Sequence, residues 1–146
     1  MRVFIDTSSL AKRYVQEPGS EELEEFFRSV VEDVYISTLA IVEFSAALGR
    51  KIRRKEIAEN ASANAMKEFE KDWQGLFTRV PLSEELAELA ASFAIQHPLK
   101  GSDAVHLSSA VACNVKIFVT SDANLLQTAK KIGIQAYDPV SGFYKG

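Results

Sequence analysis

Short runs of β-branched and aromatic residues recur along the chain, and a stretch with helical periodicity follows most of them. The clearest runs are RVFI (2–5), VYIS (34–37) and KIFVT (116–120), with weaker candidates in TRVPL (78–82) and IQAYD (134–138). Strands that alternate with helices are joined by right-handed crossovers and form mostly parallel sheets covered by helices on both faces. The pattern therefore predicts an α/β fold.

Capping residues and apolar periodicity predict where the helices lie. We expect helices over 9–17, ended by Pro18 and Gly19, and over 21–32, capped by Ser20. A third is expected from about 37 to 55, and others over 56–77, 83–97, 102–114 with Ser102 as N-cap, and 121–133 with Gly133 at its end.

The composition fits one domain spanning 1–146, since this length allows a well-buried core. The net charge of −3 gives no global attraction to nucleic acid, so any such contact needs a local basic patch. A single cysteine allows no internal disulfide and favours a reducing cytoplasm. The opening MRVFID reaches an acid after three apolar residues, too few for a signal peptide or a membrane span.

Three aspartates stand where an acid has an ordinary structural use. Asp6 and Asp122 directly follow predicted strands and suit helix N-caps, and Asp103 falls in the first turn of its helix, where negative charge complements the helix dipole. Each position alone is thus explained without any function.

Glu43 has no such local use, because it lies beyond the first turn of a helix whose sequence, STLAIVEFSAALG (37–49), is otherwise apolar or small. A buried carboxylate is costly and usually pairs, binds metal or shifts its pKa; a surface stripe or a basic partner elsewhere in the chain is the alternative.

Ligands of open α/β sheets collect beyond the carboxyl ends of the strands, at the point where strand order reverses. If the strands before Asp6 and Asp122 are neighbours there, four carboxylates share one crevice and need a counter-charge. Mg²⁺ or Mn²⁺ suits such oxygen ligands, and no His or Cys cluster with zinc spacing competes.

Four segments resemble the PIN-domain ribonucleases, most closely the VapC-type toxins of prokaryotic toxin–antitoxin pairs. They are FIDTSSLAKRYVQEPGSEE, ISTLAIVEFSAAL, LKGSDAVHLSSAV and FVTSDANLLQTAKKIGI, in the family's order and over nearly the whole chain except about 56–80. The resemblance implies a three-layer α/β/α sandwich and Mg²⁺- or Mn²⁺-dependent hydrolysis of RNA phosphodiester bonds. It further implies a homodimer silenced by a partner antitoxin, with no membrane association.

The resemblance also implies roles for individual residues. Asp6, Glu43, Asp103 and Asp122 match the family's acidic quartet, and Thr7 or Ser8 and Thr120 match hydroxyl positions near the metal. We expect Asp6 and Asp122 to bind metal directly. Asp103 is then a ligand or lies just behind one, and Glu43 is a ligand or positions the attacking water.

The densest basic run is GRKIRRK (49–55), which continues the helix of Glu43. Its residues Arg50, Lys51, Arg53 and Arg54 are candidates for contacts with RNA phosphates, against the simpler interpretation that they solvate a helix surface. Lys12, nearer Asp6, is interpreted as surface. His106, three residues after Asp103, is interpreted as a partly buried histidine with a hydrogen-bond partner, not as a general base.

Two other functions compete with a nuclease. One is a catalytically inert PIN-like module for dimerisation or RNA binding, which gives four adjacent acids no purpose. The other is a phosphoacceptor receiver domain, but the sequence has neither the paired acids after its first strand nor the lysine after its last.

Overall fold

The computed structural model describes all residues, 1–146, and contains one sheet of five parallel strands. The strands are β1 (Arg2–Ile5), β2 (Asp33–Ser37), β3 (Phe77–Val80), β4 (Ile117–Val119) and β5 (Gln135–Tyr137), in the order β3-β2-β1-β4-β5. All four neighbouring pairs are parallel. The order reverses between β1 and β4, so the strands that precede Asp6 and Asp122 are neighbours, which meets the condition set for a shared crevice.

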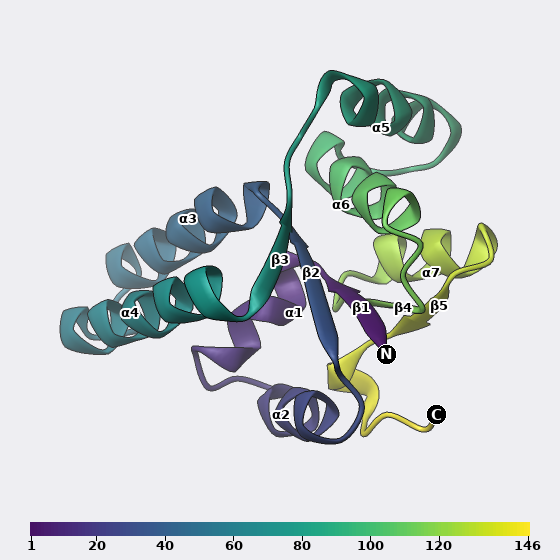
Figure 1. Ribbon diagram of the computed structural model, residues 1–146. Helices are drawn as coiled ribbons and strands as arrows, with labels where there is room; N and C mark the ends of the chain where they lie inside the picture. Colours follow the sequence, from purple (N-terminus) through teal and green to yellow (C-terminus); the bar gives the residue numbers. More distant parts are fainter.

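Helices cover both faces of this sheet (Figure 1). One face carries α1 (Thr7–Leu10), the 3₁₀ turn η1 (Ala11–Arg13), α2 (Ser20–Ser29), α3 (Leu39–Arg53) and α4 (Glu59–Gly75). The other carries α5 (Glu84–Gln96), α6 (Gly101–Ala112) and α7 (Ala123–Lys131). A last 3₁₀ turn, η2, follows β5 and spans Pro139–Ser141. The predicted three-layer α/β/α fold is confirmed.

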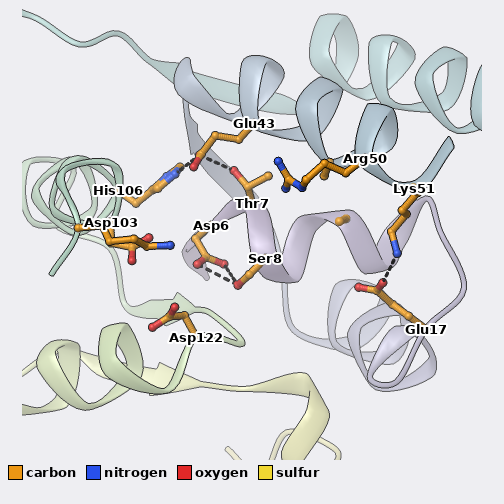
Figure 2. Close-up of a pocket in the computed structure, with 13 residues that line it drawn as sticks. Asp6, Thr7, Ser8, Glu17, Glu43, Arg50, Lys51, Asp103, His106 and Asp122 are labelled. Atoms are coloured by element: carbon orange, nitrogen blue, oxygen red, sulfur yellow. Dashed lines mark hydrogen bonds and ion pairs between the residues drawn. The ribbon is translucent and has the colours of Figure 1, made fainter. Parts of the chain in front are cut away.

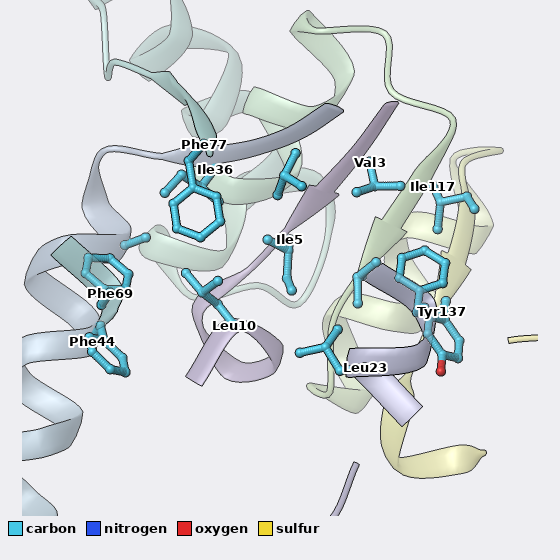
Figure 3. Packing of buried hydrophobic residues seen from close by; sticks show 14 of the residues in the cluster. Val3, Ile5, Leu10, Leu23, Ile36, Phe44, Phe69, Phe77, Ile117 and Tyr137 are labelled. Carbon is cyan, nitrogen blue, oxygen red and sulfur yellow. The ribbon is translucent and has the colours of Figure 1, made fainter. Parts of the chain in front are cut away.

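The two faces of β1 show why the sheet has two apolar cores. Successive strand residues point to opposite faces. Val3 and Ile5 therefore join the larger core, which also contains Phe44 and Phe69 (Figure 3). The rings of these two phenylalanines stack, with 4.6 Å between their centroids. Phe4 faces the other way and stacks on Phe118 at 5.6 Å, under α6 and α7. Strands buried on both faces read as continuous apolar runs, which made them visible in the sequence.

Several predicted helix boundaries are wrong. The helix expected over 9–17 ends with η1 at Arg13, well before Pro18. Ser20 does not cap α2: Gly19, with φ of 94°, occupies the N-cap, and the Ser20 hydroxyl accepts from the Glu17 N–H and donates to the Val15 carbonyl. Ser102 is not a cap either, because α6 begins one residue earlier.

No helix in the chain is both long and apolar enough to cross a membrane.

Candidate active site

One pocket lies beyond the carboxyl ends of β1 and β4, and it gathers all four predicted acids (Figure 2). Asp6 follows β1, Asp122 precedes α7, Glu43 comes from α3 and Asp103 from the first turn of α6. At about 310 Å³ the open pocket is wide enough for a hydrated ion and a phosphate. Its other polar or charged lining residues are Thr7, Ser8, Glu17, Arg50, Lys51, Lys100 and His106.

Asp6 is the most deeply buried acid, only 3% exposed, and donors surround its carboxylate. Oδ1 accepts from the Ser9 N–H at 3.2 Å, so Asp6 is indeed the N-cap of α1. The Ser8 hydroxyl donates to both oxygens, at 2.8 and 3.0 Å, and the buried Thr120 hydroxyl donates to Oδ2 at 2.7 Å. Burial raises the pKa of Asp6, although nearby His106 and the bonds from Thr120, Ser8 and Ser9 act to lower it.

Asp122 is also a helix cap. Its Oδ1 accepts from the Leu125 N–H at 2.9 Å at the start of α7, and its own N–H donates to Thr120 Oγ1 at 3.1 Å. Thr120 therefore connects the two acids that follow neighbouring strands.

Glu43 is held by two donors that approach the same oxygen. The Thr7 hydroxyl donates to Oε1 at 2.8 Å, and His106 Nε2 lies 2.5 Å from it. Burial acts to raise the pKa of Glu43, but the hydrogen bond and charge of His106, with smaller effects of Thr7 and Lys100, bring it below its ordinary value. Glu43 therefore has a basic partner from elsewhere in the chain, His106, and this partner also lines the pocket.

Asp103 accepts no hydrogen bond from the protein. Burial, followed by the charge of Asp122 and a smaller effect of Glu43, raises its pKa, while Lys100 and His106 act in the opposite direction. Mutual repulsion of this kind shows that the pocket concentrates negative charge that a cation would offset.

The donor set suits a hard, hydrated cation. No three His, Cys, Asp or Glu side chains stand close enough together to enclose an ion by themselves. Mg²⁺ usually retains several waters and is held through one or two carboxylates, so oxygens spread around an open pocket fit it.

Only part of the basic run reaches the pocket. Arg50 and Lys51 line it, whereas Arg53 and Arg54 are exposed on the last turn of α3, outside it. Lys51 is also engaged by Glu17, with 3.6 Å between Nζ and Oε2.

Two interpretations of individual residues need correction. Lys12 is not free surface: its side chain is 9% exposed, and Nζ donates to Glu17 Oε1 at 3.1 Å. His106 is not partly but fully buried, 1% exposed, and its partner is Glu43. Sequence reasoning missed Lys100, whose position just before the GSD segment of α6 was the available signal.

Comparison with known proteins identifies the family. A family model described as PIN domain matches residues 3–131. The chain belongs to the PIN domain family. The sequence-based resemblance is confirmed, and VapC proteins are among the relatives of this PIN domain.

One curated relative is ribonuclease VapC45 of Mycobacterium tuberculosis, 34% identical over 111 residues that make up 75% of each chain. The solved structure of Mycobacterium tuberculosis VapC20, described as a sarcin-ricin loop cleaving toxin, superposes with a TM-score of 0.70 at 15% identity, over 90% of this chain and 95% of that one. A toxin–antitoxin complex from Klebsiella pneumoniae contains a chain with a TM-score of 0.62 at 16% identity, covering 94% and 97%. At such identities the two structures establish the fold alone.

Proposed function

We propose that this PIN domain is a ribonuclease that hydrolyses RNA phosphodiester bonds with Mg²⁺ or Mn²⁺. The observation that carries the proposal is the convergence of Asp6, Glu43, Asp103 and Asp122, from four separate segments, on one pocket that also contains basic side chains. The likeness to ribonuclease VapC45 supports the same chemistry.

The acids would bind the ion together. Asp6 and Asp122 follow the two strands; Thr120 orients the Asp6 carboxylate and accepts from the Asp122 N–H, while Asp103 and Glu43 line the pocket from the flanking helices. When bound, such an ion lowers the pKa of a coordinated water and offsets charge that develops on the phosphate. Glu43 is kept in its charged form by His106 and Thr7, which bring its pKa below the ordinary value, so it is suited to bind the ion or to orient the attacking water by accepting a hydrogen bond from it.

The basic side chains would hold the RNA backbone. Arg50 and Lys51 line one part of the pocket from α3, and Lys100 lines it from the start of α6. Cations placed beside an acidic centre attract phosphate groups that the acids alone would repel. Arg53 and Arg54 would contribute only outside the pocket, to RNA that extends along α3.

We further propose that an antitoxin protein silences this PIN domain, and that the active form is a homodimer. The antitoxin part is supported by the likeness to a chain of the toxin–antitoxin complex from Klebsiella pneumoniae. Several large apolar side chains are exposed, among them Ile95 at 87% and Val42 at 65%, and suit such contacts. Sedimentation of the pure protein, with and without the product of a short adjacent reading frame, tests both parts.

The decisive experiment measures cleavage of RNA by the pure protein. We expect cleavage with Mg²⁺ or Mn²⁺ that EDTA stops and that Asp6→Asn abolishes without loss of the fold. Asp138→Asn is the matched control, because Asp138 also caps a turn, η2, but lies outside the pocket. Cleavage that is equal in EDTA and in Asp6→Asn would refute the proposal, and RNA binding without any cleavage would favour the inert binding module.

A further inference from the structure

His106 is a buried polar residue that the acidic quartet does not explain. It lies in α6, 1% exposed, and its ring meets the edge of Phe4 with 6.1 Å between ring centroids. Nε2 contacts Glu43 Oε1, whereas Nδ1 is buried and has no hydrogen-bond partner. A leucine would fill this space without burying an unsatisfied nitrogen, so packing alone does not account for the histidine.

The contact with Glu43 fixes which atom is the donor. A carboxylate oxygen only accepts, so Nε2 must carry the proton, whether or not the ring is charged. The Thr7 hydroxyl donates to the same oxygen at 2.8 Å. Glu43 Oε1 is therefore occupied twice, and no protein donor reaches Oε2.

Figure 2 shows the consequence: His106 and Thr7 approach the Glu43 carboxylate together, from α6 and from α1. The Glu43 side chain comes from α3 and is 32% exposed, so without these two donors it would be free to rotate toward solvent. With them, its orientation in the pocket is restricted.

We propose that His106 is a positioning residue that, together with Thr7, orients Glu43 so that Oε2 is presented to the metal or to the attacking water. This inference rests on the proposed function and adds to it a residue outside the acidic quartet. It acts by hydrogen bonding and needs no change of protonation.

The test uses two substitutions with opposite expectations. His106→Leu keeps most of the volume and removes the donor. His106→Gln keeps an N–H at similar reach. We expect His106→Leu to lower kcat for RNA cleavage by about 10–100-fold, with KM little changed, and to weaken Mn²⁺ binding measured by calorimetry or electron paramagnetic resonance. His106→Gln should restore most of both.

Ser108→Ala is the matched control in the same helix. Ser108 is fully buried, its hydroxyl has no partner, and it does not line the pocket. Neither kcat nor Mn²⁺ affinity should change in this variant.

A double-mutant cycle tests whether His106 acts through Glu43. In a Glu43→Gln background, adding His106→Leu should cause little further loss of Mn²⁺ affinity, because the group that it orients is already altered. If His106→Leu does not fold, Thr7→Val tests the same idea, because it removes the other donor to Glu43 at a partly exposed position. This variant should also lower kcat, by a smaller factor.

The outcomes separate the two proposals. Wild-type protein that neither binds Mn²⁺ nor cleaves RNA would refute the proposed function. Wild-type protein that does both, with His106→Leu unchanged or with a loss that His106→Gln does not relieve, would overturn only the role of His106.

Discussion

The hydroxyl of Thr120 joins the two acids at the strand ends, and its removal tests how the pocket is built. Thr120 is fully buried; Oγ1 donates to Asp6 Oδ2 at 2.7 Å and accepts from the Asp122 N–H at 3.1 Å. Thr120→Val keeps the branched shape and loses both bonds. A hydrogen bond to a charged group contributes about 1.5–3 kcal/mol, and stranding a buried N–H costs about 1–3 kcal/mol.

Because the pocket is open, water will partly satisfy the Asp122 N–H. We therefore expect a total loss of about 2–4 kcal/mol in the free energy of unfolding, near the lower half of the summed range. For a domain of this length each kcal/mol lowers Tm by about 2–4 °C, so Tm should fall by about 5–15 °C.

Thermal and urea unfolding in EDTA measure this loss, and Thr128→Val provides the control. Thr128 is also buried, but its hydroxyl donates to the Asn124 carbonyl within α7, at 2.9 Å. We expect Thr128→Val to cost less than about 1 kcal/mol, since that carbonyl already accepts a helical bond. Equal losses of unfolding free energy in the two variants would show that the hydrogen bonds of Thr120 to the acids stabilise the fold no more than the hydroxyl of Thr128 does.

Thr120→Val should also lower metal-dependent RNA cleavage by about 10–100-fold, because Asp6 loses one of the donors that orient it. Full activity in this variant would refute the argument that the strand-end acids need this orientation.

Three further predictions concern metal, pH and the packing of α4. Mn²⁺ at about 100 times its Kd should stabilise the wild-type protein by about 2.7 kcal/mol and should not stabilise Asp6→Asn, as measured by Tm; a wild-type Tm that Mn²⁺ leaves unchanged would contradict the metal site. Burial raises the pKa of Asp6 above its unfolded value, so the folded state holds this proton more tightly. The stability of the wild type relative to Asp6→Asn should therefore increase as the pH falls from 7 toward about 4, and urea midpoints in EDTA that keep a constant difference would count against this. Asp72→Asn weakens the acceptor of both Arg13 Nε, at 3.0 Å, and the Tyr14 hydroxyl, at 2.7 Å, and should cost about 1–3 kcal/mol in urea unfolding with RNA cleavage unchanged.

The inner strands β1, β2 and β4 were predictable because they are buried on both faces, whereas the partly exposed edge strands β3 and β5 gave weaker signals. Phe4 packs under α6 and α7 while its neighbours Val3 and Ile5 pack under α1–α4, so the whole run had to be apolar. Helix starts were less predictable, since a serine before a helical pattern has several local partners. The Ser20 hydroxyl closes the turn from Val15 and Glu17, and the left-handed φ of Gly19 begins the helix.

Two acids of the pocket were predictable from strand ends, but the partners of the acids were not. Asp6 and Asp122 follow strands, and parallel strands bring their carboxyl ends to one edge. The bond between His106 and Glu43 joins residues 63 positions apart, and no local pattern reports which helix faces which. Lys100 enters the pocket for the same tertiary reason.

At Asp122 and Glu43 the donors of the protein occupy only one carboxylate oxygen, whereas both oxygens of Asp6 accept from the protein. Asp122 caps α7 through Oδ1, and no protein donor reaches its Oδ2. Glu43 accepts both of its bonds at Oε1, so that Oε2 is free of protein donors. A capping role therefore does not argue against a role in the pocket: the cap fixes one oxygen and thereby orients the other. The start of α7 orients Asp122 in this way, whereas Glu43, inside α3, is oriented by the tertiary contacts with Thr7 and His106.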